Sequence, residues 1–568
     1  MLTEPAEEPS AVSPLPAPGG PTPPWRPPHP ALALTLRVLL VLVPFVPFAI
    51  CLWSGALTSS LWMDEINYWF YQDDPGLRAV ELGRPGSAVA PYLSTYSFGS
   101  LQRFFRWLLQ LLPGLHDLST EISVRSFSVA SFVLLVLLTW FVSFRRRRSE
   151  FEAALAALVV ASTPLLLHYA TEGRPYSLSA LLGATYLVST GRALSRGGWW
   201  TLLTAGLGFA LLRSNWWTVC IPVALTLWGA WEAWRTRSLS MRQVRLLGVI
   251  APAGLLAAAE MAFIMTTPST IEAPFPLFFP QGFRAAIVST AARAFSPFRG
   301  LDPGFVPQAI VVAASILLVV LAVLASRKRP EGEVPIALVG LGALVLSALL
   351  GGLAGRIVYG RHQVAMVGAL VFGAALATGR AANVMKAALV SLAVVFLPGT
   401  IDTMNDKGNG KALALILESK SPAGKRPALV VQHSTRLGYP DPLNTVGADF
   451  YLNAEKPQRP PFAVYELPSH TLVTNQRGVI RYFNGGPGLL RRFADSPMDE
   501  WVAWLKASSH DTLWFLWLEP ASRLERDQAA EYRDALGEAG FRPVPKSTFV
   551  LRGYPPSLLQ RFDRVDVK

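Results

Sequence analysis

Long apolar segments recur between residues 31 and 401, and short polar connections separate them. A helix that crosses the hydrocarbon core of a bilayer needs about 20 apolar residues, and most of these segments approach that length. We expect the first helix to be kinked at Pro44 or Pro47. The pattern predicts about eleven transmembrane helices, at 31–53, 126–144, 152–170, 176–193, 199–212, 216–232, 246–266, 306–325, 335–353, 363–379 and 386–401.

The two ends of the chain have a different character. Residues 1–30 are rich in proline and poor in apolar residues, which predicts a disordered tail. In residues 403–568, "RPALVVQ" and "DTLWFLWLE" are typical of buried strands, whereas "MDEWVAWLKA" and "ERDQAAEYRDALGEAG" are typical of amphipathic helices. This alternation predicts an α/β domain. The predicted fold class is therefore an α-helical polytopic membrane protein, with a helical domain at 31–402 and a C-terminal α/β domain at 403–568.

The basic residues predict how the helices are oriented. With the N-terminus in the cytoplasm, every strongly basic short loop falls on the cytoplasmic face, including "RRRR" at 145–148 and "RKR" at 327–329. This arrangement obeys the positive-inside rule. An odd number of helices then places the α/β domain outside the cytoplasm. We predict a multi-pass protein of the inner (cytoplasmic) membrane, with a cytoplasmic N-terminus and an extracytoplasmic C-terminal domain.

The composition agrees with a membrane protein. Only 16% of the 568 residues are charged and 51% are hydrophobic, whereas soluble domains carry about 25% charged residues. The formal net charge of +13 is accounted for by the basic loops. Because no basic patch is interleaved with aromatic residues, a nucleic-acid partner is not expected.

Ionisable residues gather at the predicted extracytoplasmic ends of the helices. Such groups are costly near hydrocarbon, which makes them candidates for function, although any one of them also fits an interfacial position in water or an internal ion pair. Three clusters on one face favour a shared polar cavity. They are Asp64 and Glu65 in "LWMDEINYWF", His168, Glu172, Arg174 and Tyr176 in "LLLHYATEGRPYSLSALL", and Arg356, Tyr359, Arg361 and His362 in "GRIVYGRHQVAM".

The residue types in these clusters indicate a chemistry. The guanidinium group of arginine is always charged and is planar, so Arg174 and Arg361 are suited to hold a phosphate or diphosphate. Asp64 is suited to act as a general base. A base that faces an anion beside the bilayer indicates a lipid-phosphate substrate and a hydroxyl acceptor.

Four stretches resemble the GT-C glycosyltransferases, and more narrowly the branch of the protein O-mannosyltransferases and the bacterial lipid A aminoarabinose transferases. "LWMDEINYW" resembles the Asp-Glu motif of their first extracytoplasmic loop. "LHDLSTEISVRSFSVASFVLL", with Arg125, resembles the start of their second helix, and "PLLLHYATEGRPYSLSALL" resembles their Pro…Glu-x-Arg-Pro-Tyr segment. "VYGRHQVAMVGAL" resembles their late Arg-Tyr segment, with His362 in place of the usual tyrosine. The resemblance covers residues 31–400 and not the C-terminal domain.

This resemblance implies that a hexosyl or pentosyl group moves from a polyprenyl-phosphate donor to a hydroxyl acceptor outside the cytoplasmic membrane. Asp64 matches the proposed catalytic base, and Glu65 matches its neighbour, which orients the loop or the acceptor. In-line attack at the anomeric carbon inverts its configuration. The donor site that the resemblance and the clusters predict contains Arg174, Tyr176, Arg361, His362, Glu172 and His168.

Other functions remain compatible with the same residues. A lipid or solute transporter with this polar cavity is the first alternative, and a non-catalytic sensor or assembly factor is the second. The sequence shows no internal repeat, and the charges lie at one face rather than at mid-membrane, which disfavours transport. The predicted partners are the lipid-linked sugar donor, membrane lipid, and a glycan, lipid or protein acceptor. A divalent metal on Asp64, Glu65 and His168 is not favoured, because their spacing matches no strong metal signature.

Overall fold

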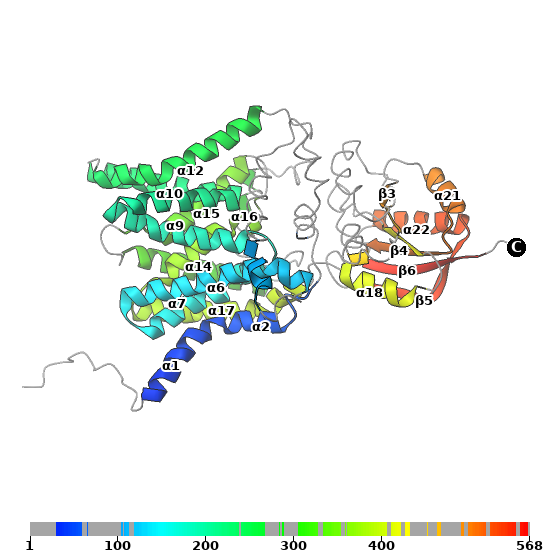
Figure 1. The fold of residues 1–568 in the computed structure, drawn as a ribbon, viewed down its shortest axis with the longest axis horizontal. Coiled ribbons are helices and arrows are strands. Elements are labelled where there is room, and N and C mark those ends of the chain that lie inside the picture. Colours follow the sequence, from blue (N-terminus) through cyan, green and yellow to red (C-terminus); the bar gives the residue numbers. More distant parts are fainter. Residues whose placement is uncertain are drawn as a thin grey trace, which may run out of the picture.

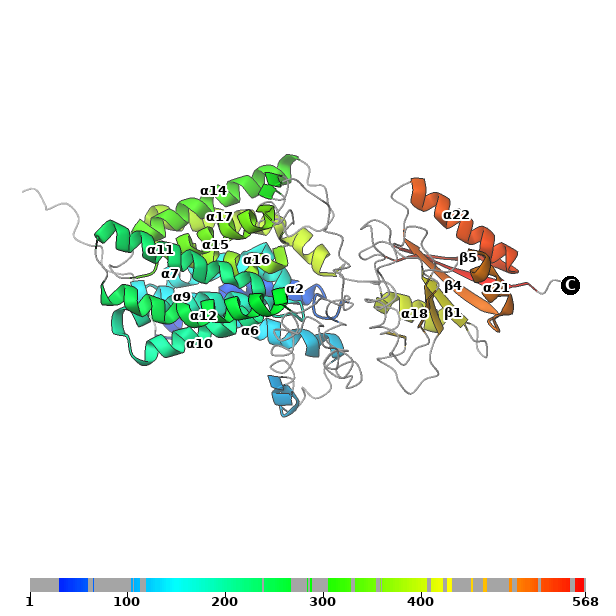
Figure 2. The same cartoon turned by 90° about the horizontal axis from the view of Figure 1, so that it is seen from above.

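The computed structural model consists of a helical bundle and an α/β domain that lies beside one end of the bundle (Figure 1). The same two parts lie side by side when the molecule is seen from above (Figure 2). The structure describes residues 30–59, 65, 104–105, 107–112, 119–237, 240–266, 283–284, 287–288, 305–327, 333–353, 358, 360–405, 410–421, 427–431, 451–452, 463–466, 490–492, 498–518, 523–551 and 557–565.

The helices of the bundle follow the apolar segments of the sequence, with ends that differ by a few residues. Two short 3-10 helices, Val43–Phe45 and Trp216–Val219, lie between longer helices. The longer helices are α1 (Pro30–Leu42), α2 (Val46–Trp53), α6 (Thr120–Arg147), α7 (Glu150–Ser162), α8 (Pro164–Ala170), α9 (Tyr176–Arg196), α10 (Trp199–Ser214), α11 (Cys220–Thr236), α12 (Met241–Thr266), α14 (Phe305–Arg327), α15 (Ile336–Leu353), α16 (Gly360–Ala375) and α17 (Arg380–Asn405).

The surface of the bundle identifies a multi-pass membrane protein. Large apolar side chains are exposed on α1, α10 and α12, including Leu34, Leu202 and Leu255. Lipid favours this exposure, whereas water penalises it. The count of about eleven spans and the direction of the termini remain predictions. Among the described residues, α7 and α8 would form a further span if the bent pair is counted as one. The four single segments that are long and apolar enough to cross a membrane are Leu34–Trp53, Thr120–Arg147, Ile336–Leu353 and Arg380–Asp402.

Proline explains where two helices depart from a straight path. The predicted kink in the first helix is confirmed, since the 3-10 turn Val43–Phe45 with Pro44 separates α1 from α2. The prediction of one helix over 152–170 is wrong, because α7 and α8 meet at a 69° bend. Thr163 has an extended backbone (ψ 116°), which is the conformation that a following proline favours, and Pro164 begins α8.

Helix α16 lies in the middle of the bundle. Every residue from Gln363 to Ala375 is buried. Glycine allows the backbones to approach closely, because a Cβ on Gly373 would come within 2.3 Å of the Ala337 nitrogen in α15. A Cβ on Gly368 would come within 2.9 Å of Ala180 in α9. Small residues thus fix α16 against its neighbours, as is common between membrane helices, and its first turn carries Arg361 and His362.

The C-terminal domain is an α/β sandwich, as the sequence predicted. The strands β1 and β4 and the helices α21 and α22 coincide with the four predicted elements, whereas α18, β2, β3, β5 and β6 were not predicted. The sheet has the order β3-β2-β1-β4-β6-β5, in which β3, β2, β1 and β4 are parallel. The bounds are α18 (Gly410–Lys420), β1 (Pro427–Val431), β2 (Ala463–Glu466), β3 (Leu490–Arg492), α21 (Met498–Ala507), β4 (Thr512–Leu518), α22 (Arg523–Glu538), β5 (Phe541–Leu551) and β6 (Ser557–Arg564).

The two faces of the sheet belong to different cores. Leu429 and Val431 of β1 pack with α18, whereas Ala428 and Val430 pack with α21 and α22. This alternation is the ordinary consequence of strand geometry. The core beneath α18 also contains Val124 from the second turn of α6. The α/β domain is therefore packed directly against the bundle at the start of α6.

Candidate functional site

A buried ion pair joins the Asp-Glu motif to α6. Arg125 Nε donates to Glu65 Oε1 over 2.9 Å, and Arg125 Nη2 donates to Glu65 Oε2 over 2.9 Å. Both side chains are 0% exposed. Such a two-bond pair between arginine and a carboxylate fixes orientation as well as distance. Burial also means that either charge alone would be costly, so the two residues form one structural unit.

A backbone contact brings a third segment to this ion pair. The N–H of Gly173 donates to Glu65 Oε1 over 2.7 Å. Gly173 has no room for a side chain, because a Cβ would lie 2.2 Å from Cγ1 of Val124 and 3.4 Å from Glu65 Oε1. The turn between α8 and α9 is thereby held against both α6 and the Asp-Glu motif. Arg174 follows Gly173 directly in the chain.

Arg125 also holds the chain that follows α2. Its Nη1 donates to the carbonyl oxygens of Ala56, Leu57 and Ser59 at 2.9–3.1 Å. Carbonyl groups at the C-terminal end of a helix have no intrahelical partners, and a cation there is favourable. One guanidinium group thus fixes both the end of α2 and, through Glu65, the Asp-Glu motif.

The predicted donor-site residues Arg174 and Tyr176 lie against each other. The guanidinium carbon of Arg174 is 5.4 Å from the centre of the Tyr176 ring, which is a cation–π distance. The carbonyl oxygen of Arg174 accepts a 2.9 Å hydrogen bond from Ser128 of α6. Tyr176 is buried and meets Tyr169 edge-on, with ring centres 5.0 Å apart. The backbone that carries Arg174 is consequently fixed from two sides.

His168 and Glu172 form a second buried pair. His168 Nε2 lies 3.9 Å from Glu172 Oε2, and both side chains are almost fully buried. The His168 ring meets Tyr169 edge-on at 4.8 Å. The pair lies at the end of α8, immediately before the turn that contains Gly173.

The start of α16 is linked to the start of α9 through the end of α10. Ser179 donates to Ser214 over 2.8 Å, and the next residue, Asn215, donates to the carbonyl oxygen of His362 over 3.3 Å. The Trp217 ring lies 6.4 Å from the His362 ring. All three sequence clusters therefore reach the same end of the bundle. We call this end the rim: residues 54–59, Glu65, the first turns of α6 and α16, and residues 168–176.

Not every predicted site residue is described. Asp64 lies outside the described residues, although its peptide bond to Glu65 keeps the two Cα atoms about 3.8 Å apart. Glu65, His168, Glu172, Arg174, Tyr176, Arg361 and His362 are described, and all belong to the rim. Within the described part of the chain, no three His, Cys, Asp or Glu side chains are gathered as metal ligands.

From the sequence, Arg125 was assigned to the start of the second helix and was not predicted to be a site residue. The structure shows that it organises the rim. A signal for this was available, because a charged residue that lies one turn inside an apolar helix needs a buried partner. Glu121, one turn earlier in α6, is buried for the same reason and pairs with Lys411.

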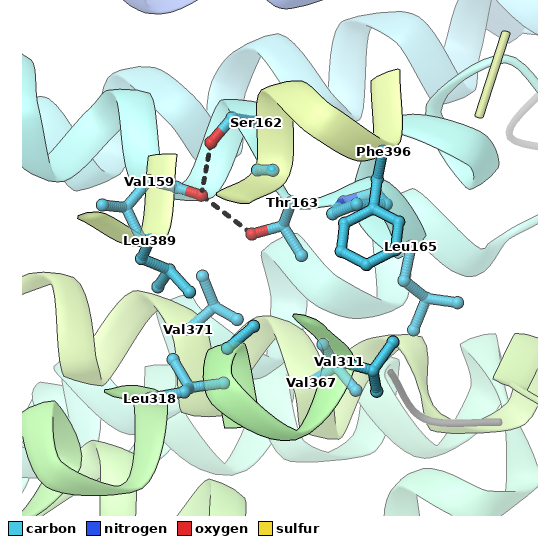
Figure 3. A pocket seen from close by; sticks show the side chains of 13 residues that line it. Val159, Ser162, Thr163, Leu165, Val311, Leu318, Val367, Val371, Leu389 and Phe396 are labelled. Atoms are coloured by element: carbon cyan, nitrogen blue, oxygen red, sulfur yellow. Dashed lines mark hydrogen bonds between the residues drawn. The ribbon is translucent and has the colours of Figure 1, made fainter. Parts of the chain in front are cut away.

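An apolar pocket lies below the rim, where α7 bends into α8 (Figure 3). It has a volume of about 60 Å³ and lies between α7, α8, α14, α16 and α17. Its two hydroxyl groups, on Ser162 and Thr163, donate to the carbonyl oxygen of Val159, so its wall is apolar. Its lining residues are Val159, Ser162, Thr163, Pro164, Leu165, Val311, Ala314, Leu318, Val367, Val371, Leu389, Ala393 and Phe396.

Two rim residues lie on the helices that line this pocket. An α-helix rises about 1.5 Å per residue, which puts His168 about 4.5 Å along α8 from Leu165. By the same measure Arg361 lies about 9 Å along α16 from Val367. The charged residues at the rim and the apolar pocket are thus separated by about one to two turns of helix.

No family model matches the chain, and no curated protein matches it. Solved structures do match, among them those of ArnT from Cupriavidus metallidurans in the apo state and bound to undecaprenyl phosphate. Each has 14% identity and a TM-score of 0.36, and each match covers 93% of this chain and 98% of the ArnT chain. A likeness this weak carries no conclusion about the substrate or activity of the present chain.

Proposed function

We propose that this protein is a membrane glycosyltransferase that moves a sugar from a polyprenyl-phosphate donor to a hydroxyl acceptor. The observation that carries the proposal is the contact between Glu65 and the Gly173 N–H. It joins the segment that contains Asp64 to the segment that contains Arg174. A general base and a phosphate-binding cation are the two groups that this reaction requires.

In the proposed reaction, Asp64 takes the proton of the acceptor hydroxyl group as its oxygen attacks the anomeric carbon. The bond between that carbon and the phosphate oxygen breaks, and its electron pair stays on the lipid phosphate. Attack from the face opposite the leaving group inverts the configuration. The phosphate is already a good leaving group, so no general acid is needed. Arg174 and Arg361 stabilise the growing negative charge in a site that excludes water.

Glu65 and Asp64 have different roles in this proposal. Glu65 is neutralised by Arg125 and bonded to Gly173, so we assign it a positioning role. A carboxylate that is saturated by buried partners is a poor base, because protonation would break its ion pair. Asp64 is therefore the residue to which we assign proton transfer.

A short part of the polyprenyl chain of the donor, next to the phosphate, would enter the apolar pocket at the bend between α7 and α8, and the rest would lie in lipid. The pocket wall is apolar, and its helices α8 and α16 continue to His168 and Arg361 at the rim. Binding the tail in the pocket would bring the phosphate to the level of these side chains. The rim would face away from the cytoplasm, because the basic ends of α6, α9 and α14 lie at the other end of the bundle.

The decisive test compares wild-type protein with Asp64→Asn in lipid nanodiscs. We expect sugar transfer from polyprenyl-phosphate sugars to be lost, with the donor still bound. Asp402→Asn is the matched control, because Asp402 is an exposed carboxylate near the same end of the bundle, two residues before Met404, which contacts Ser59. Transfer that persists in Asp64→Asn would refute the assignment. Mass spectrometry of lipids that co-purify with the protein would identify the donor.

A transporter would give a different result in the same system. Wild-type protein would then move the lipid or solute across a liposome membrane without forming a glycosidic bond. Measurement of both flux and product in one preparation separates the two functions. Product formation that follows Asp64 supports the transferase.

A further inference from the structure

Charges of alternating sign connect the α/β domain to the Asp-Glu motif. Lys411 Nζ of α18 lies 2.6 Å from Glu121 Oε1 in the first turn of α6. Arg125 follows Glu121 by one helical turn, so the two side chains lie on the same face of α6. Arg125 in turn is paired with Glu65. The row Lys411, Glu121, Arg125 and Glu65 is thus electrically neutral, and it runs from the C-terminal domain to the rim.

The two cations of this row hold one short segment. Arg125 binds the carbonyl oxygens of Ala56, Leu57 and Ser59, and Lys411 Nζ donates to the remaining one, that of Thr58, at 3.4 Å. Every carbonyl oxygen from residue 56 to residue 59 therefore accepts a hydrogen bond from a cation. The segment is the continuation of α2, where unsatisfied carbonyl groups favour positive charge.

The end of α17 holds the same segment from another side. Ser59 Oγ donates to the carbonyl oxygen of Met404 over 3.2 Å. Asn405 Nδ2 donates to the carbonyl oxygen of Ser54 over 3.2 Å. Residues 404 and 405 lie only a few residues before α18 in the chain. Residues 54–59 are consequently fixed by α6, by α17 and by the first helix of the α/β domain.

Helix α18 is itself fixed against α6 by apolar contact. Leu413 and Leu417 belong to the same buried cluster as Val124. The Glu121 side chain is 2% exposed, so the ion pair with Lys411 is shielded on that side from water. Shielded ion pairs are screened much less by salt than surface pairs are. Packing places the backbone of α18, and contacts with Glu121 and with the Thr58 carbonyl oxygen place the Lys411 ammonium group, whose side chain is 40% exposed.

We infer that Lys411 and Glu121 are positioning residues for the proposed sugar transfer, through which the C-terminal domain sets the place of the catalytic loop. The inference rests on the proposed function. In the sequence, Asp64 is five residues after Ser59 and directly precedes Glu65. The described residues on both sides of this connection are anchored, residues 56–59 by Arg125 and Lys411, and Glu65 by Arg125 and Gly173. Removal of Lys411 takes away one of the contacts that hold residues 54–59, the one at the Thr58 carbonyl oxygen.

The first test is the kinetics of Lys411→Ala. We expect kcat to fall about 10-fold to 100-fold, because a displacement of about 1 Å in a catalytic group has effects of this size. The KM for the lipid donor should stay within about twofold, since Arg174 and Arg361 are untouched. The Lys411→Arg variant keeps the positive charge and should retain most of the wild-type kcat. The matched control is Lys506→Ala, which breaks the exposed pair with Glu538 elsewhere in the same domain and should leave kcat unchanged.

A double-mutant cycle tests whether the two residues act together. Glu121→Gln should lower kcat by a similar factor, and the variant with both changes should be no worse than either one. Independent effects that multiply would contradict the inference. If Lys411→Ala fails to fold, the cycle is made with Lys411→Gln, which keeps most of the side-chain volume and removes the charge.

Hydrogen exchange of residues 54–59 tests the anchor without any enzymatic readout. We expect faster exchange in Lys411→Ala than in wild-type protein and no change in Lys506→Ala. Unchanged exchange together with unchanged kcat would overturn the inference. If wild-type protein transfers no sugar, the proposed function fails, and exchange still decides whether Lys411 holds this segment.

Discussion

The amide nitrogen of Gly173 lies 2.7 Å from Oε1 of Glu65, although 108 residues separate them in the chain. This bond joins the loop after α2 to the turn before α9. It also explains the residue types, since the carboxylate needs a donor and the turn has no space for a side chain. The Asp-Glu motif and the Glu-x-Arg-Pro-Tyr segment thus meet where the Glu65 side chain accepts a hydrogen bond from the Gly173 backbone.

Gly173→Ala should therefore damage the rim. Its Cβ would lie 2.2 Å from Val124 Cγ1 and 3.1 Å from the Val124 carbonyl oxygen, so the turn must move away from Glu65. Overpacking of this kind costs about 1–3 kcal/mol. We expect a lower melting temperature in nanodiscs and a large loss of transfer. Gly191→Ala in α9 is the control, because a Cβ there meets nothing within 4 Å. Equal behaviour of the two variants would argue against the close contact.

Arg125→Met should be among the most destabilising single changes at the rim. It leaves Glu65 buried without its cation, and breaking such a pair costs about 3–5 kcal/mol. Arg125→Lys should recover only part of this, because one ammonium group cannot donate to two carboxylate oxygens and three carbonyl groups at once. Denaturant unfolding in mild detergent measures the difference.

The control for Arg125 is Arg37→Met. Arg37 pairs with Glu150 at 3.0 Å, but its side chain is 67% exposed. Exposed pairs contribute about 0–1 kcal/mol, so this variant should unfold almost like the wild-type protein. If Arg125→Met is equally mild, then the buried pair with Glu65 does not organise the rim.

The sequence predicted the helical bundle well, because apolar segments of membrane length leave few alternatives. Its errors have local causes. Pro164 breaks the third predicted helix, and proline in an apolar segment gives no indication of how far a helix bends. Helix α18 was not predicted, although "GKALALILESK" has an apolar face, because it is only 11 residues long.

The sequence predicted which residues belong to the candidate site, but not which residues they contact. The sequence placed Glu65 beside Asp64 as a second candidate for catalysis, and the structure shows it bound by Arg125 and Gly173. Pairing across 60 or 108 residues depends on helix packing, which a single sequence does not reveal. The contact between Lys411 and Glu121 also escaped prediction, because the domain that carries Lys411 lay outside the resemblance.

Arg174→Gln should weaken binding of the lipid phosphate. The guanidinium group is stacked on Tyr176 and its backbone is held by Ser128, so it is preorganised for an anion. Loss of one charge-assisted contact costs about 1.5–3 kcal/mol, which is roughly a 10-fold to 100-fold rise in Kd for polyprenyl phosphate. Arg174→Lys should be intermediate, because it keeps the charge and loses the planar fork.

Arg213→Gln provides the comparison for Arg174. Arg213 lies at the end of α10 and stacks on Phe209 at 5.5 Å, so it has the same chemistry at the same end of the bundle. Affinity for polyprenyl phosphate, measured by microscale thermophoresis in nanodiscs, should be unchanged in this variant. A similar loss in both variants would indicate a general effect of surface charge and not a phosphate site at Arg174.

The apolar pocket predicts a dependence on the length of the lipid chain. Ala314→Trp would fill space between α14 and the bend at Pro164, because Ala314 lines the pocket. We expect the Kd for a long polyprenyl phosphate to rise about 10-fold, which corresponds to about 1.4 kcal/mol, while a short-chain analogue binds as before. Val312→Trp is the control, since Val312 is on the same helix, is 57% exposed and does not line the pocket. Equal losses for long and short chains would show that the effect does not depend on the tail, and would contradict placement of the tail in this pocket.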